Sequence, residues 1–234
     1  MKIFGNNDLP VLYQDEDLLV INKPSGLLSI QDGYHADYPH LKTVLEPIYG
    51  KIWLVHRLDK DTSGIILLAR NAKIHRELNR IFRERQIEKI YHGFVSPVPE
   101  WWEMDIHLPL LPNMDRQHRT RVNTKTGKKA HSACRILKWF DLGVLMKIQI
   151  LTGITHQIRA HLRAYNFALL GDTLYAAGLN PQPFHVSRTM LHAREIAFRH
   201  PSKHTRLHLI APYPDDFRHT YERLKLTKAR DVMI

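Results

Sequence analysis

One short stretch of the chain brings together the side-chain types that acid–base or nucleophilic chemistry needs. Residues 56–64 read His-Arg-Leu-Asp-Lys-Asp-Thr-Ser-Gly, and the apolar run 65–69 follows at once. A rigid scaffold can aim charged groups that lie at the end of a buried strand, and functional residues concentrate on loops held in this way. A solvated turn before a core strand shows the same local pattern, so the rest of the chain has to distinguish the two interpretations.

Asp59 is the candidate for chemistry in this stretch, and two other segments could assist it. A carboxylate can attack a sugar carbon or act as a base without any cofactor. Tyr91 lies in a Lys-x-Tyr strand, where its ring could pack on a substrate base, and Arg159 lies in a Gln-x-Arg segment. A cation such as Arg159 would keep a partly buried Asp59 ionised. A buried pair of arginine and aspartate could equally be structural, and local sequence leaves both readings open.

The chain has 16 histidines, but their spacing does not match known metal motifs. It has no His-Glu-x-x-His run and no cysteine pair, and His156 and His161 are five residues apart. It also has no Gly-rich phosphate loop, no serine elbow and no dinucleotide fingerprint. Asp59 and Asp61 could suggest a metal-dependent nuclease, but two carboxylates alone are weak support. We therefore expect no metal and no cofactor.

The charge balance points to a polyanionic partner. The 234 residues include 34 Lys and Arg against 23 Asp and Glu, a formal net charge of +11. An excess of this size favours nucleic acid. No apolar run approaches the roughly 20 residues that span a bilayer, and residues 1–8 are too short and polar for a secretory signal. Cys134 is the single cysteine, which suits a reducing compartment, so we expect a cytoplasmic protein without a membrane partner.

Two basic surfaces could bind phosphates. Residues 116–140 contain no Asp or Glu, and a turn at Thr126 and Gly127 predicts a hairpin with a strongly positive exposed tip. The predicted phosphate contacts in this hairpin are Arg119, Arg121, Lys125 and Lys128. A helix predicted from the N-cap Asn71 to about Gln86 carries further Lys and Arg opposite its apolar face. For most of the Lys and Arg residues of this helix, an ordinary solvent-exposed face is the simpler interpretation.

Short apolar runs separated by turns predict an α+β fold. Strands are expected at 18–21, 87–95, 144–150, 190–198 and 205–211, and helices at 41–49, 71–86, the second half of 152–162 and 215–224. Many strands with few helices argue for a mainly antiparallel sheet. We expect one continuous domain over residues 1–234, with its core at about 11–212 and room for two lobes. Ile158, Leu162 and Tyr165 should face the core, and residues 180–184 should form a Pro-rich loop.

The stretch 56–64 resembles the His-Arg-Leu-Asp-x-x-Thr-Ser-Gly signature of the RluA-type pseudouridine synthases. Further motifs of that family accompany it in the family's order along the chain. They are Asn-Lys-Pro-Ser-Gly-Leu at 22–27, Lys-x-Tyr at 89–91, Gly-Lys-Lys-Ala at 127–130, Thr-His-Gln-Ile-Arg-Ala-His at 155–161, Gly-Asp at 171–172 and Met-Leu-His-Ala at 190–193. The resemblance covers residues 11–212, and the signature is highly specific.

The resemblance implies a fold and a reaction. The fold would be the pseudouridine synthase fold, in which helices flank a mainly antiparallel mixed sheet around a central catalytic cleft. The reaction would convert a uridine in RNA to pseudouridine without a metal or cofactor: the C–N glycosidic bond breaks, the uracil turns, and a C–C bond forms at C5. The target would be flipped out of the stack, because its sugar carbon and base face are otherwise inaccessible. A stem-loop of ribosomal or transfer RNA is the expected partner, since unpairing costs less in a loop.

The resemblance also implies roles for single residues. Asp59 matches the essential carboxylate, which either attacks C1′ or removes a proton from C2′. Tyr91 matches the tyrosine that packs on the target base and helps to remove the C5 proton, and Arg159 matches the residue that pairs with the acid. Arg57 matches the arginine that enters the space left by the flipped nucleotide, and its neighbour His56 is expected among the RNA contacts.

The chain departs from the family pattern at a few positions. Ile154 stands where the family commonly has Arg, so one RNA or structural contact could be missing, and Gly93 and Ala176 replace a usual Ala and Gly. Because the first motif lies close to the start of the given sequence, we expect the protein to lack the N-terminal S4-like module of some relatives. A non-catalytic RNA-binding or RNA-folding protein on the same scaffold is the alternative function, and the positive charge and Ile154 are the reasons to consider it. We expect a monomer, and the sequence does not identify the uridine.

Overall fold

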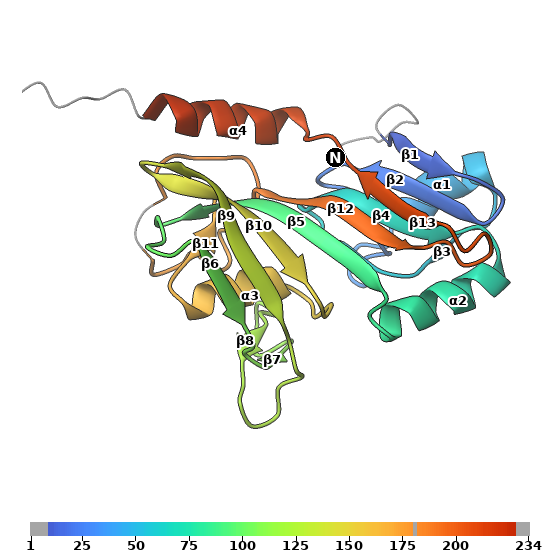
Figure 1. Cartoon of the computed structure of the whole chain (residues 1–234), viewed down its shortest axis with the longest axis horizontal. Helices are drawn as coiled ribbons and strands as arrows, with labels where there is room; N and C mark the ends of the chain where they lie inside the picture. The colour runs from blue at the N-terminus through green and yellow to red at the C-terminus, as the bar shows by residue number, and fades with distance from the viewer. Residues whose placement is uncertain (1–8, 180–181, 228–234) are drawn as a thin grey trace, which may run out of the picture. The chain divides into compact units, whose positions relative to one another are not determined.

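The computed structural model describes residues 9–179 and 182–227 (Figure 1). The chain divides into two compact units: unit 1 comprises Met1–Lys89 and Ala193–Pro212, and unit 2 comprises Ile90–His192 and Tyr213–Ile234. Two strands, β5 (Ile87–Ser96) and β12 (Leu191–Arg199), begin in one unit and end in the other. The polar N-terminus 1–8 and residues 180–181 of the predicted Pro-rich loop lie outside the described residues.

Unit 1 is built on antiparallel strands. β1 (Val11–Gln14) pairs with β2 (Leu18–Lys23), and β2 pairs with β4 (Ser63–Ala69). β3 (Trp53–Leu54) also pairs with β4, and β13 (Arg206–Ile210) pairs with β12. The register of β2 and β4 sets Lys23 opposite Gly64. The end of β2 therefore lies beside the polar stretch that precedes β4.

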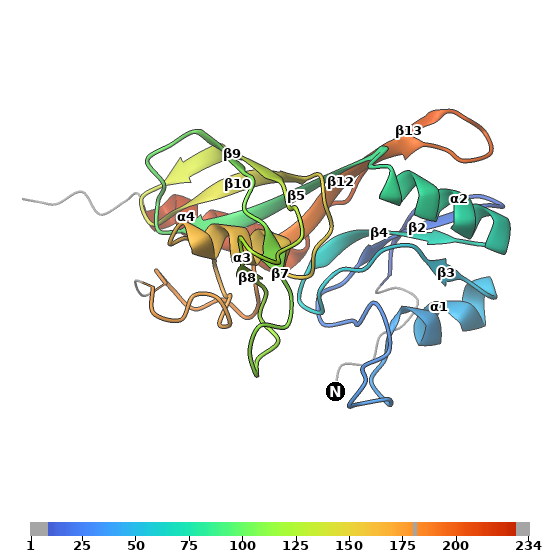
Figure 2. The same ribbon diagram turned by 90° about the horizontal axis from the view of Figure 1, so that it is seen from below.

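Both faces of this sheet are covered, which explains the continuous apolar runs in β2 and β4. Because side chains alternate between faces along a strand, Ile65 and Leu67 pack in one core with α2 (Ala72–Arg83). Ile66 and Leu68 pack in a second core with α1 (Leu41–Tyr49). Figure 2 shows the two helices on opposite sides of β2 and β4. The predicted strand 18–21 and the helix 41–49 are confirmed.

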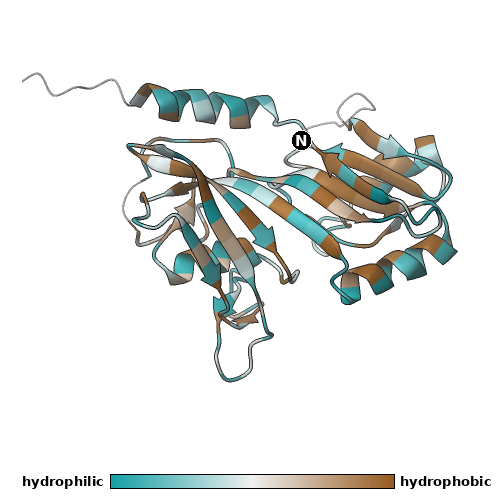
Figure 3. Cartoon of the chain, in the orientation of Figure 1, coloured by the Kyte–Doolittle hydropathy of each residue, from teal (hydrophilic) through white to brown (hydrophobic). Residues whose placement is uncertain are grey.

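Helix α2 begins where the sequence predicts and ends slightly earlier. Asn71 caps it, since its side-chain oxygen accepts a hydrogen bond from the Ile74 amide at 2.9 Å. The buried residues of the helix are Ile74, Leu78 and Ile81. Figure 3 shows hydrophobic and hydrophilic residues along the same helix, as expected when one face is buried. The helix ends at Arg83 rather than Gln86, because Arg85 adopts a left-handed φ of 58°.

Unit 2 has an antiparallel sheet in the order β5, β10 (Gly143–Ile150), β9 (Ser132–Phe140) and β6 (Glu103–Ile106). β11 (Ala168–Leu169) pairs with β5. Helix α4 (Asp215–Leu226) places Phe217 and Leu224 in a core with Phe94 and Leu145. The predicted strands 87–95 and 144–150 and the final helix are confirmed.

Helix α3 (Gln157–Ala164) follows β10. Ile158 and Leu162 are buried as predicted, at 5% and 1% exposure. Tyr165 is 39% exposed, so its predicted core position is wrong. The reason is that Tyr165 is the C-cap residue and lies just beyond the buried turns of the helix.

The basic segment, residues 116–140, folds differently from the hairpin that the sequence predicts there. β7 (Leu110–Leu111) pairs with β8 (Arg121–Val122), so residues 112–120 form the connection. The Asn123 side chain accepts hydrogen bonds from two backbone amides of the turn that follows β8. Lys128, beyond that turn, bridges back to Leu110. The Gly127 amide closes this turn with a hydrogen bond to the Asn123 carbonyl at 2.9 Å. The residues on both sides of it, Val122 and Lys128, pair with Leu110 of β7, which corrects the predicted position of the hairpin tip.

The α+β class is confirmed, and the described ladders between named strands within each unit are antiparallel. The single domain over residues 1–234 stays a prediction. In the described ranges, none of the helices has the length and apolar character that crossing a bilayer requires.

Candidate functional site

Asp59 lies in a turn immediately before β4, in unit 1. The Thr62 amide donates a hydrogen bond to the Asp59 carbonyl at 3.1 Å. Asp59 is partly buried, whereas Asp61 is exposed. The two aspartates therefore belong to a turn and do not share the face of a strand. This geometry removes the main reason for reading them as a nuclease pair.

Ser29 fixes the backbone on the N-terminal side of Asp59. Its Oγ donates to the Leu58 carbonyl at 2.8 Å and accepts from the Leu58 amide at 3.0 Å. Ser29 is only 3% exposed, so water competes little for these hydrogen bonds. Sequence reasoning did not identify this serine, because its partner is 29 residues away in the chain.

Lys23 and Gly26 fix the backbone on the C-terminal side. The Gly26 amide donates to the Lys60 carbonyl at 2.8 Å, and the Lys23 ammonium donates to the same oxygen at 3.2 Å. Lys23 is fully buried, and its ammonium also donates to the carbonyls of Pro24 at 2.9 Å and Leu27 at 2.8 Å. A buried ammonium is stable only with such partners. The motif at 22–27 therefore binds the turn that bears Asp59.

Gly64 permits a close approach of two backbones at the start of β4. Its φ is +113°, and a Cβ at this position would lie 2.3 Å from the Ala193 carbonyl oxygen. No residue with a side chain fits such a contact. The glycine of the signature therefore has a steric cause, and its contact belongs to the late Met-Leu-His-Ala motif.

His56 packs into the core of unit 1. Its Nε2 accepts a hydrogen bond from the Leu67 amide at 2.9 Å, so the neutral ring carries its proton on Nδ1. The ring stacks on Phe82 with the two centroids 5.0 Å apart. Burial, and then the positive charge of Lys89, lower the pKa of His56 to about 3. These contacts tie the start of the signature to β4 and α2.

Lys89, the first residue of the Lys-x-Tyr motif, lies beside the same aromatic ring. Its Nζ is 5.8 Å from the centroid of Phe82. Burial, and then the positive charge of Arg85, lower the pKa of Lys89 to about 8. Phe82 therefore contacts two motif residues, His56 and Lys89. The position of Phe82 on the apolar face of α2 did not predict these contacts.

Arg57 is exposed, in contrast to its neighbours. His56 before it is partly buried, and Leu58 after it is only 4% exposed. The backbone of Arg57 is therefore anchored while its guanidinium reaches solvent. This placement suits contact with a large polar ligand.

Tyr91 lies on β5 in unit 2, opposite Ile148 of β10, and is 8% exposed. A side chain on a central strand is held more firmly than one on a loop. The structure thus gives Tyr91 a rigid support within its own unit.

Arg159 on α3 is held by a buried carboxylate. Its Nε and Nη2 donate to the two oxygens of Asp172 at 2.7 and 2.8 Å, a bidentate pair. The guanidinium carbon also lies 4.8 Å from the centroid of the Tyr175 ring. Within unit 2 the carboxylate that pairs with Arg159 is Asp172, and the expected pairing with Asp59 stays a prediction.

Asp172 and Tyr175 connect Arg159 to the basic segment. Asp172 also accepts hydrogen bonds from the amides of Leu174 at 3.1 Å and Tyr175 at 3.0 Å. The Tyr175 hydroxyl accepts from the Thr120 amide at 2.7 Å and donates to the Thr120 carbonyl at 3.2 Å. Burial raises the pKa of Tyr175, which keeps the hydroxyl protonated. Sequence reasoning missed Tyr175, because its partner is 55 residues away.

Ile154, the departure from the family pattern, has a packing role. It packs against an apolar cluster of Leu110, Ala130, Ala160 and Tyr175. Its amide donates to the side-chain oxygen of Gln157 at 3.1 Å, which fixes the approach to α3. An isoleucine here stabilises the base of the basic segment.

Asp115 neutralises part of that segment. It forms ion pairs with Arg119 at 2.6 Å and Arg121 at 2.9 Å. Partial desolvation would raise the pKa of Asp115, but the hydrogen bonds from the two arginines outweigh it and lower the pKa to about 2. Lys125 and Lys128 are exposed. Residues 116–140, which contain no Asp or Glu, begin directly after Asp115, so the sequence analysis of the basic segment did not include this carboxylate.

A cavity of about 510 Å³ opens beside these arginines in unit 2. Its lining combines guanidinium groups with apolar side chains and includes Arg119, Arg121, Arg163, Val122, Leu174 and Tyr175. Such a lining suits an anion attached to a flat apolar group.

Proteins of known family align with most of this chain. The sequence profile described as RNA pseudouridylate synthase matches residues 17–164. The dual-specificity RNA pseudouridine synthase RluA of Pasteurella multocida is 35% identical over 206 residues, which cover 87% of this chain and 93% of that protein. The ribosomal large subunit pseudouridine synthase C of Buchnera aphidicola is 34% identical over 221 residues, which cover 91% of this chain and 69% of that protein.

A solved structure shares the fold. The human RNA pseudouridylate synthase domain containing 4 aligns with a TM-score of 0.74 at 26% identity, covering 92% of this chain and 93% of that chain. The predicted pseudouridine synthase fold is therefore confirmed. Fold, signature and sequence identity agree: the chain belongs to the RluA-type RNA pseudouridine synthases, isomerases that convert uridine in RNA to pseudouridine.

Proposed function

We propose that this synthase uses Asp59 as its catalytic carboxylate on a uridine of structured ribosomal or transfer RNA. The observation that carries the proposal is the support of the Asp59 turn. Ser29 binds the backbone on one side of the acid, and Lys23 binds it on the other. A carboxylate with a fixed backbone can be presented to a sugar carbon without reorganisation.

The proposed reaction rearranges one nucleotide without adding or removing an atom. Asp59 either attacks C1′ or removes the C2′ proton, and in both routes the glycosidic C–N bond breaks. The freed uracil turns, and its C5 forms a bond with C1′. The proton on C5 then leaves, and N1 gains a proton. In the first route the bond between Asp59 and C1′ is released again, and in the second the C2′ proton returns.

Tyr91 and Arg159 assist this chemistry. Tyr91 packs on the target base and helps to remove the C5 proton, and its place on β5 supports this role. In the proposal Arg159 is the cation that pairs with the carboxylate of Asp59. Asp172 is a positioning residue in the proposal, because its two oxygens orient the guanidinium of Arg159.

The proposed RNA contacts come from both units. Arg57 enters the space left by the flipped nucleotide, which its exposed side chain on an anchored backbone supports. Lys125 and Lys128 contact phosphates, together with Arg119 and Arg121 beside the cavity. For His56 we propose a structural role in place of the predicted RNA contact, because its ring accepts a hydrogen bond from β4.

The class of RNA is inferred from the relatives. One is named for dual specificity on RNA and another for the large ribosomal subunit. We propose a stem-loop of ribosomal or transfer RNA as the substrate and a cytoplasmic monomer as the working form. The single cysteine, Cys134, is buried in β9, which fits a reducing compartment.

The proposal is tested by mapping pseudouridines in total RNA from a strain that lacks the gene, using primer extension blocked by carbodiimide adducts. We expect at least one site to disappear and to return with the wild-type gene or with Asp61→Asn, but not with Asp59→Asn. Restoration by Asp59→Asn would contradict the assignment of the carboxylate. A growth phenotype that Asp59→Asn rescues while the site stays unmodified would favour the non-catalytic RNA-binding alternative.

A further inference from the structure

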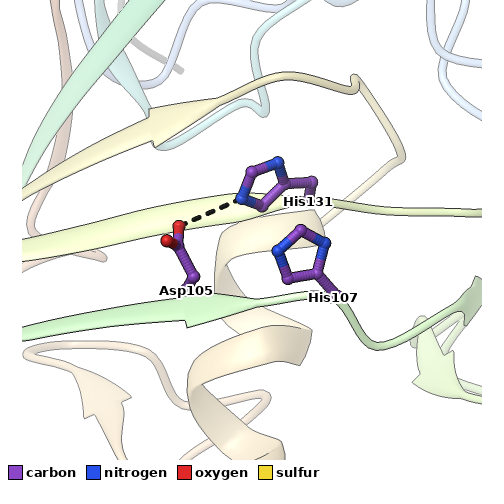
Figure 4. A group of neighbouring side chains, drawn as sticks. All are labelled: Asp105, His107 and His131. Atoms are coloured by element: carbon purple, nitrogen blue, oxygen red, sulfur yellow. Dashed lines mark hydrogen bonds and ion pairs between the residues drawn. The ribbon is translucent and has the colours of Figure 1, made fainter.

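Three side chains of unit 2 with metal-binding atoms meet at one edge of the β6–β9 pair. Asp105 lies in β6, His107 directly follows that strand, and His131 directly precedes β9. The antiparallel register sets Asp105 opposite Ala133 and Ile106 opposite Ser132. Residues two apart on a strand share a face, and the next position opposite His107 is that of His131. Figure 4 shows the three side chains gathered on this face.

The distances within this group suit a single small ion. One ligand atom from each residue lies within 4.8 Å of the others, and His131 Nε2 is 3.0 Å from Asp105 Oδ1. The two imidazole rings are stacked with centroids 3.9 Å apart. Zinc binds imidazole nitrogen and carboxylate oxygen at about 2.0–2.2 Å, which places two ligand atoms of one ion roughly 3–3.5 Å apart. Small rotations of the exposed Asp105 and His107 side chains would bring the three atoms to that spacing.

The chemistry of the group selects the type of ion. Two imidazoles and one carboxylate are the ligands of zinc, nickel and cobalt sites, whereas magnesium and calcium prefer oxygen alone. Asp105 and His107 are exposed and His131 is partly buried, so an ion can enter from solvent.

The backbone beneath the histidines is well fixed. The His131 amide donates to Thr152 Oγ1 at 3.0 Å, and the His131 carbonyl accepts from Gln157 Nε2 at 2.9 Å. Buried His161 forms hydrogen bonds with the Leu108 carbonyl and with Ser132 Oγ, both at 2.9 Å. His161 therefore links the residue after His107 to the residue after His131, and the two ligands are held close together before any ion binds.

We propose that Asp105, His107 and His131 bind one divalent transition-metal ion of the zinc type, and that this ion closes the base of the segment 108–130. That segment carries β7, β8 and the basic side chains. An ion bound by residues at both ends of this segment would reduce the conformational freedom of the residues between them, as the closure of a loop does. The proposal is independent of the catalytic role of Asp59. Its competitor is a plain ion pair between Asp105 and a protonated His131, with His107 stacked alongside.

The first test measures zinc binding to the full chain by competition with a chromophoric chelator. The variants are Asp105→Asn, His107→Ala and, as a matched control, His118→Ala, which removes an exposed histidine of the same segment outside the group. We expect one zinc ion per chain, at least about ten-fold weaker binding in the first two variants, and unchanged binding in His118→Ala. Thermal unfolding without metal checks that each variant folds. No stoichiometric zinc, equal binding by His107→Ala, or an equal loss in His118→Ala would overturn the site.

The second test measures the closing role by limited proteolysis of the segment 108–130 with and without zinc chloride. Zinc should slow cleavage in the wild type and in His118→Ala but not in His107→Ala. Zinc binding that leaves cleavage of the wild type unchanged would overturn the closing role. Cobalt chloride provides an independent readout: visible absorption bands in the wild type would report a bound ion of low coordination number, and their loss in His107→Ala would identify His107 as a ligand.

Discussion

The Asp59 turn in unit 1 and the Arg159 support in unit 2 are fixed in different ways. Around Asp59 the main chain is held directly: Ser29 binds the amide and carbonyl of Leu58, and Gly64 lets two backbones touch. Around Arg159 the side chain is held by other side chains, chiefly the carboxylate of Asp172.

This difference shows which substitutions should disturb each region. A turn fixed through its backbone is disturbed when an added Cβ or a lost hydrogen bond moves the main chain. A buried ion pair is disturbed when one of its charges is removed. The two regions should therefore respond to different classes of substitution, and each prediction below has a matched control in its own unit where the chain offers one.

Gly64→Ala should have the largest effect on stability. The new Cβ would overlap the Ala193 backbone at a φ of +113°, so we expect the free energy of unfolding to fall by more than about 4 kcal/mol. Gly50 is the control: it also has a positive φ, +70°, but nothing lies within 4 Å of its Cβ position. Gly50 has a ψ of −164°, a region that essentially only glycine adopts, so Gly50→Ala should cost about 1–3 kcal/mol from backbone strain alone. Urea denaturation measures both, and equal losses would contradict the steric account of the signature glycine.

Asp172→Ala should have the next largest effect. It removes both hydrogen bonds to Arg159 and those to two backbone amides, so we expect a loss of about 3–5 kcal/mol. The control is Glu103→Ala, which breaks an exposed pair with Arg135 and should cost less than about 1 kcal/mol. A small loss in Asp172→Ala, measured in the same denaturation experiment, would mean that the side-chain network does not stabilise unit 2.

Ser29→Ala should have a smaller effect on stability and a clear effect on activity. Losing the two hydrogen bonds to Leu58 should cost about 1–3 kcal/mol and loosen the Asp59 turn. We expect the single-turnover rate to fall while the Kd for RNA stays unchanged, with Ser25→Ala of the same segment as the control. A weaker Kd with an unchanged rate would show that Ser29 supports RNA binding rather than the acid.

His56→Gln should have the smallest effect on stability near neutral pH, and its main effect should be a change in the pH dependence of stability. The folded pKa of His56, about 3, lies below the ordinary value of 6.5, so its neutral form favours folding above pH 6.5. That contribution is lost as the pH falls from 6.5 towards 3, by no more than about 1.4 kcal/mol per pH unit, because a single proton binds. Glutamine can accept the Leu67 hydrogen bond without titrating, so the stability curve of the variant should be flatter in this window. Parallel curves would contradict the structural role of His56.

Local patterns predicted the elements of both units well, and the reason is physical. The runs in β2 and β4 are buried on both faces, and α2 has one apolar face and an N-cap, so their signals lie within a few neighbouring residues. The connection of the basic segment was predicted less well. Its pairing depends on a two-residue strand, β7, which is too short to show a periodic pattern.

The support of the candidate site could not be predicted, because it depends on contacts between distant residues. Ser29 and Tyr175 meet partners 29 and 55 residues away. The cluster of Asp105, His107 and His131 forms only through the register of β6 and β9, so no spacing motif indicates it. The candidate acid Asp59, by contrast, is predicted from its motif, which local sequence does contain.

The most direct test of the account is the release of tritium from cellular RNA labelled at uracil C5. Wild type, Asp59→Asn and Asp61→Asn are compared under single-turnover conditions, together with the Kd of each for the same RNA. The account predicts that Asp59→Asn binds RNA normally but releases tritium at least about 1000-fold more slowly, a rise of roughly 4 kcal/mol in the barrier, while Asp61→Asn resembles the wild type. Release at the wild-type rate by Asp59→Asn would contradict the central claim.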